Sequence, residues 1–80
     1  MENNRYFFAV DLGATSGRTI VGTLAEGKIQ LEELTRFENN LIETGGHFYW
    51  DIFALYNEII KGLKLVAKRQ LPIVSIGIDT

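Results

Sequence analysis

Cysteine is absent from this 80-residue sequence, and proline and histidine each occur only once. Without cysteine, neither a disulfide framework nor a thiolate metal site can form, as is common in cytoplasmic proteins. The net charge of −2 supplies no basic field, so a nucleic-acid partner is not expected. No apolar run is long enough to cross a bilayer, and the polar residues 1–5 do not open a signal peptide. These absences predict a cytoplasmic protein without a membrane partner.

The composition of this short chain is typical of a globular protein. Hydrophobic residues make up 46% of the sequence and glycine occurs eight times, which argues against disorder. A chain of this length can form one small domain, provided that its core is well packed. The single histidine, His47, lies in a polar stretch without a cysteine or a second histidine as partner. A surface position is therefore favoured for His47 over a metal-binding or catalytic role.

Three strands are predicted in the first half of the chain. Aromatic and apolar residues indicate them at residues 6–11, 18–24 and 28–37. A short connection of small residues joins the first two strands and fits a hairpin. In the third strand the apolar alternation changes parity near Glu32 and Glu33, which indicates a β-bulge. The polar, glycine-bearing residues 38–49 are expected to form a loop.

One helix and a fourth strand complete the pattern. Apolar residues recur at spacings of three and four from Ile52 to Val66, which predicts a helix with Asp51 as its N-cap and an end near Arg69. The apolar run 73–78 is typical of a strand that is buried on both faces in parallel pairing. A right-handed crossover would place this strand parallel to an earlier one, with the helix covering one face of the sheet.

The predicted order β-β-β-α-β, with a mixed sheet, defines an α/β protein that is not doubly wound. Two successive hairpins followed by a helical crossover match the opening of the ribonuclease H-like fold, which ATPases of the actin, hexokinase and chaperone type share. We expect an incomplete version of this fold. Because many functions share one fold, the function has to be argued from a site.

The connection between the first two predicted strands carries the clearest chemical signal. It combines an acid, two glycines, two hydroxyl residues and an arginine, namely Asp11, Gly13, Gly17, Thr15, Ser16 and Arg18. Gly13 and Gly17 permit the positive φ values that turn successive backbone N–H groups toward one anion. The hydroxyl groups can add hydrogen-bond donors, and Arg18 adds a delocalised positive charge. The segment therefore predicts a phosphate-binding hairpin.

Asp11 lies where Mg²⁺ bound to a phosphate would need a carboxylate, with water between them because Mg²⁺ keeps much of its hydration shell. A plain glycine-rich hairpin, in which Asp11 caps the turn, is the alternative. The segment is not a Walker loop, because no lysine follows at the required spacing and a strand follows in place of a helix.

At this point the sequence resembles a known family. Residues 10–18 look like the first phosphate motif of the FGGY family of carbohydrate kinases, in the version found in members that phosphorylate L-rhamnulose. Residues 36–40, 50–52 and 75–80 resemble further stretches of the same members in order and spacing. The resemblance covers nearly the whole chain. It implies that residues 1–80 are the N-terminal part of the first kinase domain, with the remainder of that domain and a C-terminal domain lying elsewhere.

The resemblance also implies an activity, namely transfer of the γ-phosphoryl group of ATP to the 1-hydroxyl group of the ketose L-rhamnulose, with Mg²⁺, in L-rhamnose catabolism. It assigns the ATP site to Gly13, Ala14, Thr15, Ser16, Gly17 and Arg18. It places Asp11 near the metal ion, and Asp79 and Thr80 in the vicinity of the sugar. The catalytic base of these kinases is an aspartate that this chain does not contain, so the chain alone is expected to be inactive.

Other interpretations stay open at the level of sequence. The chain could belong to a kinase of the same family that acts on another sugar or polyol. It could also be a nucleotide-binding module of the actin and chaperone type without kinase activity, or a small α/β interaction domain. If the chain is a fragment of a larger kinase domain, we expect the sheet edge left unpaired to favour self-association.

Overall fold

The computed structural model describes residues 4–80 and contains six strands and one helix. In chain order they are β1 (Arg5–Leu12), β2 (Ser16–Ala25), β3 (Lys28–Glu38), β4 (Ile42–Thr44), β5 (His47–Tyr49), α1 (Ile52–Lys68) and β6 (Ile73–Asp79). The three long strands, the helix and the last strand confirm the order predicted from the sequence. Only the small β4–β5 pair was not expected.

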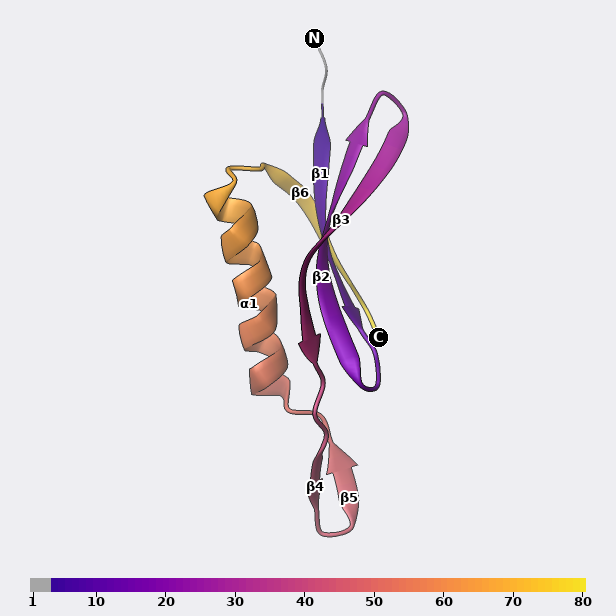
Figure 1. Ribbon diagram of the computed structural model, residues 1–80, viewed down its shortest axis with the longest axis vertical. Helices are drawn as coiled ribbons and strands as arrows, with labels where there is room; N and C mark the ends of the chain where they lie inside the picture. The colour runs from indigo at the N-terminus through magenta and orange to yellow at the C-terminus, as the bar shows by residue number, and fades with distance from the viewer. Residues whose placement is uncertain (1–3) are drawn as a thin grey trace.

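Four strands form one mixed sheet in the order β3-β2-β1-β6. β2 is antiparallel to both β1 and β3, whereas β6 returns through α1 to lie parallel to β1. Figure 1 shows α1 running alongside this sheet and the β4–β5 hairpin extending away from it, so that the molecule measures 58 × 23 × 16 Å. The predicted α/β class with a mixed sheet and a parallel last strand is therefore confirmed.

The predicted bulge in β3 is also confirmed. Thr19 pairs with Thr35, but the next residue of β2, Ile20, pairs with Glu33. Leu34 is therefore the extra residue, one position after the predicted site at Glu32 and Glu33. Between the bulge and the β1–β2 turn, every β2–β3 pair is shifted by one residue. This shift decides which β3 side chains lie beside that turn.

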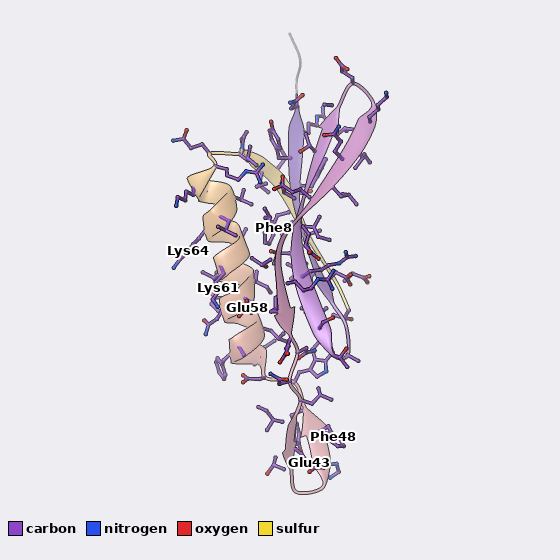
Figure 2. The ribbon with its side chains drawn as sticks, in the orientation of Figure 1. Phe8, Glu43, Phe48, Glu58, Lys61 and Lys64 are labelled. Atoms are coloured by element: carbon purple, nitrogen blue, oxygen red, sulfur yellow. The ribbon has the colours of Figure 1, made fainter. Side chains whose placement is uncertain are left out.

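Helix α1 begins and ends as the sequence predicts. The Asp51 carboxylate accepts a hydrogen bond from the Ala54 N–H at 3.1 Å, so Asp51 is the N-cap. The helix ends at Lys68, and Gln70 then takes a left-handed conformation with φ of 57°. Figure 2 shows Lys61 and Lys64 on the side of α1 away from the sheet.

Nowhere in residues 4–80 is there a helix with the length and apolarity that spanning a membrane requires.

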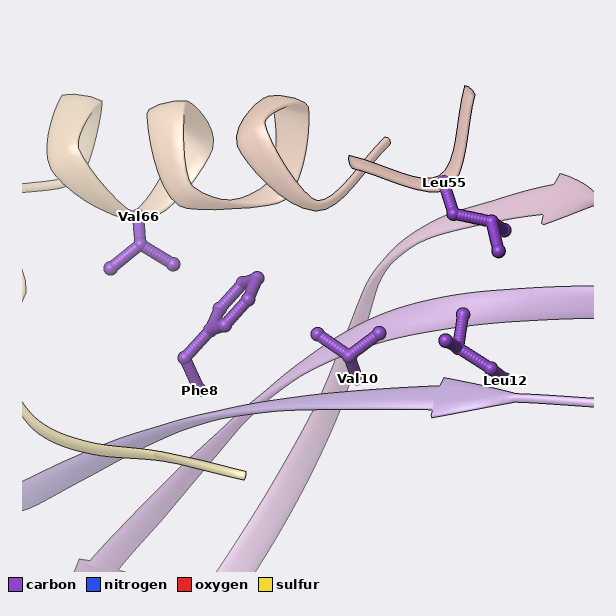
Figure 3. Close-up of a cluster of buried hydrophobic side chains, with 5 residues drawn as sticks. All are labelled: Phe8, Val10, Leu12, Leu55 and Val66. Carbon is purple, nitrogen blue, oxygen red and sulfur yellow. The ribbon is translucent and has the colours of Figure 1, made fainter. Parts of the chain in front are cut away.

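The core lies between α1 and one face of the sheet. Phe8, Val10 and Leu12 of β1 point toward the helix, where Leu55 and Val66 pack against them (Figure 3). All five side chains are buried. Because side chains alternate along a strand, this packing directs the intervening residues of β1 to the opposite face of the sheet.

Two expectations from the sequence are wrong in detail. Residues 38–49 do not form a simple loop, because β4 and β5 make a short antiparallel hairpin. Its turn uses Gly45 and Gly46, whose φ values of 59° and 78° suit a tight two-residue connection. His47 lies in β5 and is exposed, as predicted. In Figure 2 the labelled Glu43 and Phe48 mark this hairpin, which lies apart from the core.

The second correction concerns β6, which is not buried on both faces. Val74, Ile76 and Ile78 are 61%, 55% and 58% exposed. The physical reason is that β6 is an edge strand of the sheet, and within it Ile73 is the residue that packs against the core. The apolar run correctly predicted a parallel strand, but burial also depends on what lies beside that strand.

Candidate functional site

A pocket of about 240 Å³ lies beside the turn between β1 and β2. It is lined by Asp11, Gly13, Ser16, Gly17, Arg18 and Arg36. The side chains of Asp11 and Arg18 lie on the face of the sheet opposite α1, because their neighbours Val10 and Thr19 are buried beneath the helix. Five of the residues predicted from the sequence therefore lie around one pocket.

The other predicted residues lie close to the pocket but do not line it. Ala14 and Thr15 form the exposed tip of the turn. Asp79 is the residue of β6 directly beside Asp11, and Thr80 follows it. Polar groups at the carboxyl ends of the neighbouring parallel strands β1 and β6 therefore gather at one end of the sheet, where sites of open α/β sheets usually lie.

Strand register arranges four charged residues in one row across the sheet. Arg36 lies opposite Arg18, Arg18 opposite Asp11, and Asp11 opposite Asp79. Residues that face each other on neighbouring strands share one face of a sheet. The row therefore runs from two positive side chains on β3 and β2 to two negative side chains on β1 and β6.

The middle of this row is an ion pair. Nε of Arg18 lies 3.1 Å from a carboxylate oxygen of Asp11, and the two side chains are 42% and 47% exposed. An ion pair this exposed adds little to stability, at most about 1 kcal/mol. The contact is made through Nε and not through the terminal guanidinium nitrogens. The pair therefore orients Arg18 at the pocket.

Arg36 is a pocket residue that the sequence analysis did not identify. Its guanidinium also contacts Glu33, at 2.6 Å. Counting pairs from the β2–β3 turn without a bulge would place Thr35 opposite Arg18. The bulge at Leu34 moves Arg36 into that position. The sequence therefore contained the information that Arg36 lies opposite Arg18. The change of apolar parity that predicted the bulge also implies the one-residue shift that places Arg36 there.

The predicted role of the glycines is wrong. Gly13 and Gly17 do not have positive φ values; among residues 4–80 the glycines that do are Gly27, Gly45 and Gly46. The N–H of Gly13 donates to the carbonyl of Ser16 at 2.8 Å, so it is used inside the turn. A nest built on left-handed glycines is therefore absent from this part of the chain.

Space, not backbone conformation, explains why Gly17 is a glycine. A Cβ atom there would lie 2.5 Å from the ring of Phe37 and 3.2 Å from the Leu12 side chain. At Gly13 it would lie 3.1 Å from the Ser16 carbonyl oxygen. The turn thus packs closely against β3, and the small residues permit that approach.

A metal ion held by the protein alone does not fit this donor set. In residues 4–80 no group of three or more His, Cys, Asp or Glu side chains is placed to hold a metal. Asp11 and Asp79 do offer two carboxylates on neighbouring strands. Mg²⁺ bound to a nucleotide takes most of its ligands from phosphate and water and needs only one or two carboxylates. These two residues therefore suit a nucleotide-bound Mg²⁺ better than a metal centre of their own.

Comparison with known proteins gives a consistent result. A rhamnulokinase of Bacteroides thetaiotaomicron is 72% identical over 74 residues, which cover 92% of this chain and 15% of that relative. A rhamnulokinase of Halalkalibacterium halodurans is 53% identical over 75 residues, covering 94% of this chain and 16% of the relative. One of Oceanobacillus iheyensis is 50% identical over 72 residues, covering 90% and 15%.

The chain thus spans about 15% of the length of these relatives, and it matches their N-terminal part. No family model matches the chain. The similarity to curated relatives is nevertheless high and covers nearly all of its residues. The chain belongs to the rhamnulokinase family.

Proposed function

We propose that this chain is the phosphate-binding part of an ATP-dependent kinase that transfers a phosphoryl group to the 1-hydroxyl group of L-rhamnulose. The relatives carry the name rhamnulokinase, and a kinase uses ATP. The observation that carries the proposal is the pocket at the β1–β2 turn, where Arg18 and Arg36 lie on neighbouring strands beside Asp11.

The charge distribution supports binding of a triphosphate. Arg18 and Arg36 face each other on adjacent strands, and an anion placed between them would interact with both guanidinium groups. Ser16 lines the same pocket and can add a hydroxyl donor. Enzymes transfer phosphoryl groups largely by positioning them and stabilising their charge. When bound, Mg²⁺ would neutralise part of the phosphate charge, and Asp11 with Asp79 would hold it.

The sheet order supports a ribonuclease H-like domain of the FGGY kinase type. Three antiparallel strands, a helical crossover and a parallel fourth strand are the opening of that fold. The carboxyl end of β6 places Asp79 and Thr80 beside the pocket, and we propose that the sugar approaches there. The catalytic base and the adenine-binding surface would come from parts of the protein outside this chain.

Titration of the chain with Mg²⁺·ATP, followed through backbone amide shifts in NMR spectra, tests the proposal. We expect shifts around the β1–β2 turn, and we expect Arg18→Gln to weaken binding about tenfold, because it removes a charge-assisted contact. Arg5→Gln is the matched control, since Arg5 is exposed at the opposite end of β1. Equal affinities of the two variants would contradict the proposal.

A coupled kinase assay on the chain alone should show no turnover.

We also propose that the chain associates with a second copy through the edge of β6. This strand exposes its backbone edge and the apolar Ile76 and Ile78, and it contains no lysine, arginine or proline, whereas the other edge strand, β3, carries five charged residues. Sedimentation velocity should show dimers at high concentration, and Ile76→Lys should remove them. Leu31→Lys, on exposed β3, is the control. A chain that remains monomeric at every concentration would refute this.

A further inference from the structure

Asn39 is a buried polar residue at the end of β3, with only 5% of its surface exposed. Its backbone N–H donates to the Thr15 carbonyl at 3.0 Å. Its side-chain Nδ2 donates to the Gly13 carbonyl at 2.9 Å. One residue, 24 or more positions away along the chain, thus binds two carbonyl groups of the β1–β2 turn.

These two contacts fix the direction of two amide groups. In a trans peptide unit the carbonyl of one residue and the N–H of the next point in opposite directions. All peptide bonds among the described residues are trans. Because the carbonyls of Gly13 and Thr15 point to Asn39, the N–H groups of Ala14 and Ser16 point away from it. The N–H groups of Ala14 and Ser16 therefore point away from the side of the turn that β3 covers.

The Asn39 side chain also stands in for one backbone hydrogen bond of a tight hairpin. A tight hairpin between Gly13 and Ser16 would have two backbone hydrogen bonds, one from each N–H to the other carbonyl. Within residues 4–80 only the bond from Gly13 N–H to Ser16 is made. The Gly13 carbonyl, which would accept the second, binds the Asn39 side chain instead. The Ser16 N–H therefore makes no backbone hydrogen bond to the Gly13 carbonyl.

We propose that Asn39 is a positioning residue for the phosphate site, which directs the Ala14 and Ser16 amides toward the phosphate groups. This inference rests on the proposed function. It replaces the left-handed glycines as the means by which the turn presents its N–H groups. Phosphate oxygens bind backbone amides well when several are directed to one place, and here a side chain from the end of β3 provides the direction.

Inorganic tripolyphosphate with Mg²⁺ is the appropriate probe, because it lacks the adenosine that other parts of the protein would bind. NMR titration of the chain should shift the Ala14 and Ser16 amides more than that of Gly13, whose N–H is engaged with Ser16. Asn39→Asp keeps the shape of the side chain but loses the donor, so binding should weaken about tenfold. Asn40→Asp is the matched control, because it adds the same charge to the neighbouring, exposed residue.

A second readout separates positioning from general structural damage. In Asn39→Asp the Nε–H of Arg18 should still respond to tripolyphosphate, because its contact with Asp11 does not involve Asn39. The Ala14 and Ser16 amides should no longer respond. A purely structural role would weaken all three responses together, and that result would overturn the inference.

The remaining outcomes are also decisive. If Asn39→Asp binds tripolyphosphate as tightly as Asn40→Asp, the inference is wrong while the proposed function stands. If no amide of the unmodified chain responds to tripolyphosphate or to Mg²⁺·ATP, the proposed function fails, and the inference fails with it. If Asn39→Asp does not fold, the tripolyphosphate titration of the unmodified chain tests the inference. A larger shift at the Gly13 amide than at the Ala14 and Ser16 amides would overturn it.

Discussion

Replacing Phe8 with alanine is expected to lower the free energy of unfolding of this chain by about 4 kcal/mol. Phe8 is 1% exposed and lies in the middle of the core, between β1 and α1 (Figure 3). A domain of this size has a total stability of about 4–12 kcal/mol. The helix and the sheet are joined by a small core, so removing its largest side chain should leave much of the population unfolded at room temperature.

Urea unfolding, followed through the circular dichroism of the helix, measures this effect. Phe53→Ala is the matched control, because Phe53 is 80% exposed and undergoes the same chemical change. A surface change of this kind is expected to alter stability by no more than about 0.5 kcal/mol. Equal midpoints for the two variants would show that the contact between β1 and α1 does not hold the molecule together.

The parts of the fold that depend on local signals could be predicted from the sequence. The spacing of apolar residues defined α1, and Asp51 marked its start because a carboxylate there accepts an N–H from the first turn. The small residues between β1 and β2 correctly marked a hairpin. Each of these features depends on residues within about four positions of one another, which is the range over which a sequence pattern acts.

The candidate site depends on contacts between residues far apart in the chain, and the sequence analysis named only some of the residues that line the pocket. The residues of the β1–β2 turn were found because they are adjacent in the chain, and five of them line the pocket. Arg36 reaches the pocket only through the one-residue register shift at Leu34. Asn39 reaches the turn through contacts that no periodicity encodes. Strand register and tertiary contacts therefore had to be seen in the structure.

The glycines show why a residue type alone does not define a conformation. Gly13 and Gly17 were expected at positive φ because glycine allows it, yet glycine also permits close approach without any unusual φ. At Gly17 the close neighbour is Phe37, twenty residues further along the chain. By contrast, Gly45 and Gly46, which were assigned to a loop, do adopt positive φ in the β4–β5 turn.

Replacing Gly62 of α1 with alanine is also expected to change the free energy of unfolding strongly. The change is opposite in sign to the usual effect of this substitution in a helix. Replacing an exposed helical glycine with alanine normally stabilises a helix by about 1 kcal/mol. At Gly62, however, a Cβ atom would lie 2.6 Å from Oγ1 of Thr19 and 2.9 Å from the ring of Phe8. Both neighbours are fully buried, so they can make room for a methyl group only by disturbing the packing around them. We expect Gly62→Ala to lower the free energy of unfolding by about 2 kcal/mol.

Gly77→Ala in β6 is the control for urea unfolding, because nothing lies within 4 Å of the position that its new methyl group would take.

The Gly62→Ala substitution should also affect the arginines of the pocket. Thr19 hydrogen-bonds Thr35 at 2.6 Å, and these two residues directly follow Arg18 and precede Arg36. Displacing Thr19 would therefore disturb both arginines, so Gly62→Ala should bind Mg²⁺·ATP more weakly than Gly77→Ala. A stabilised Gly62→Ala would mean that α1 lies farther from the sheet than described.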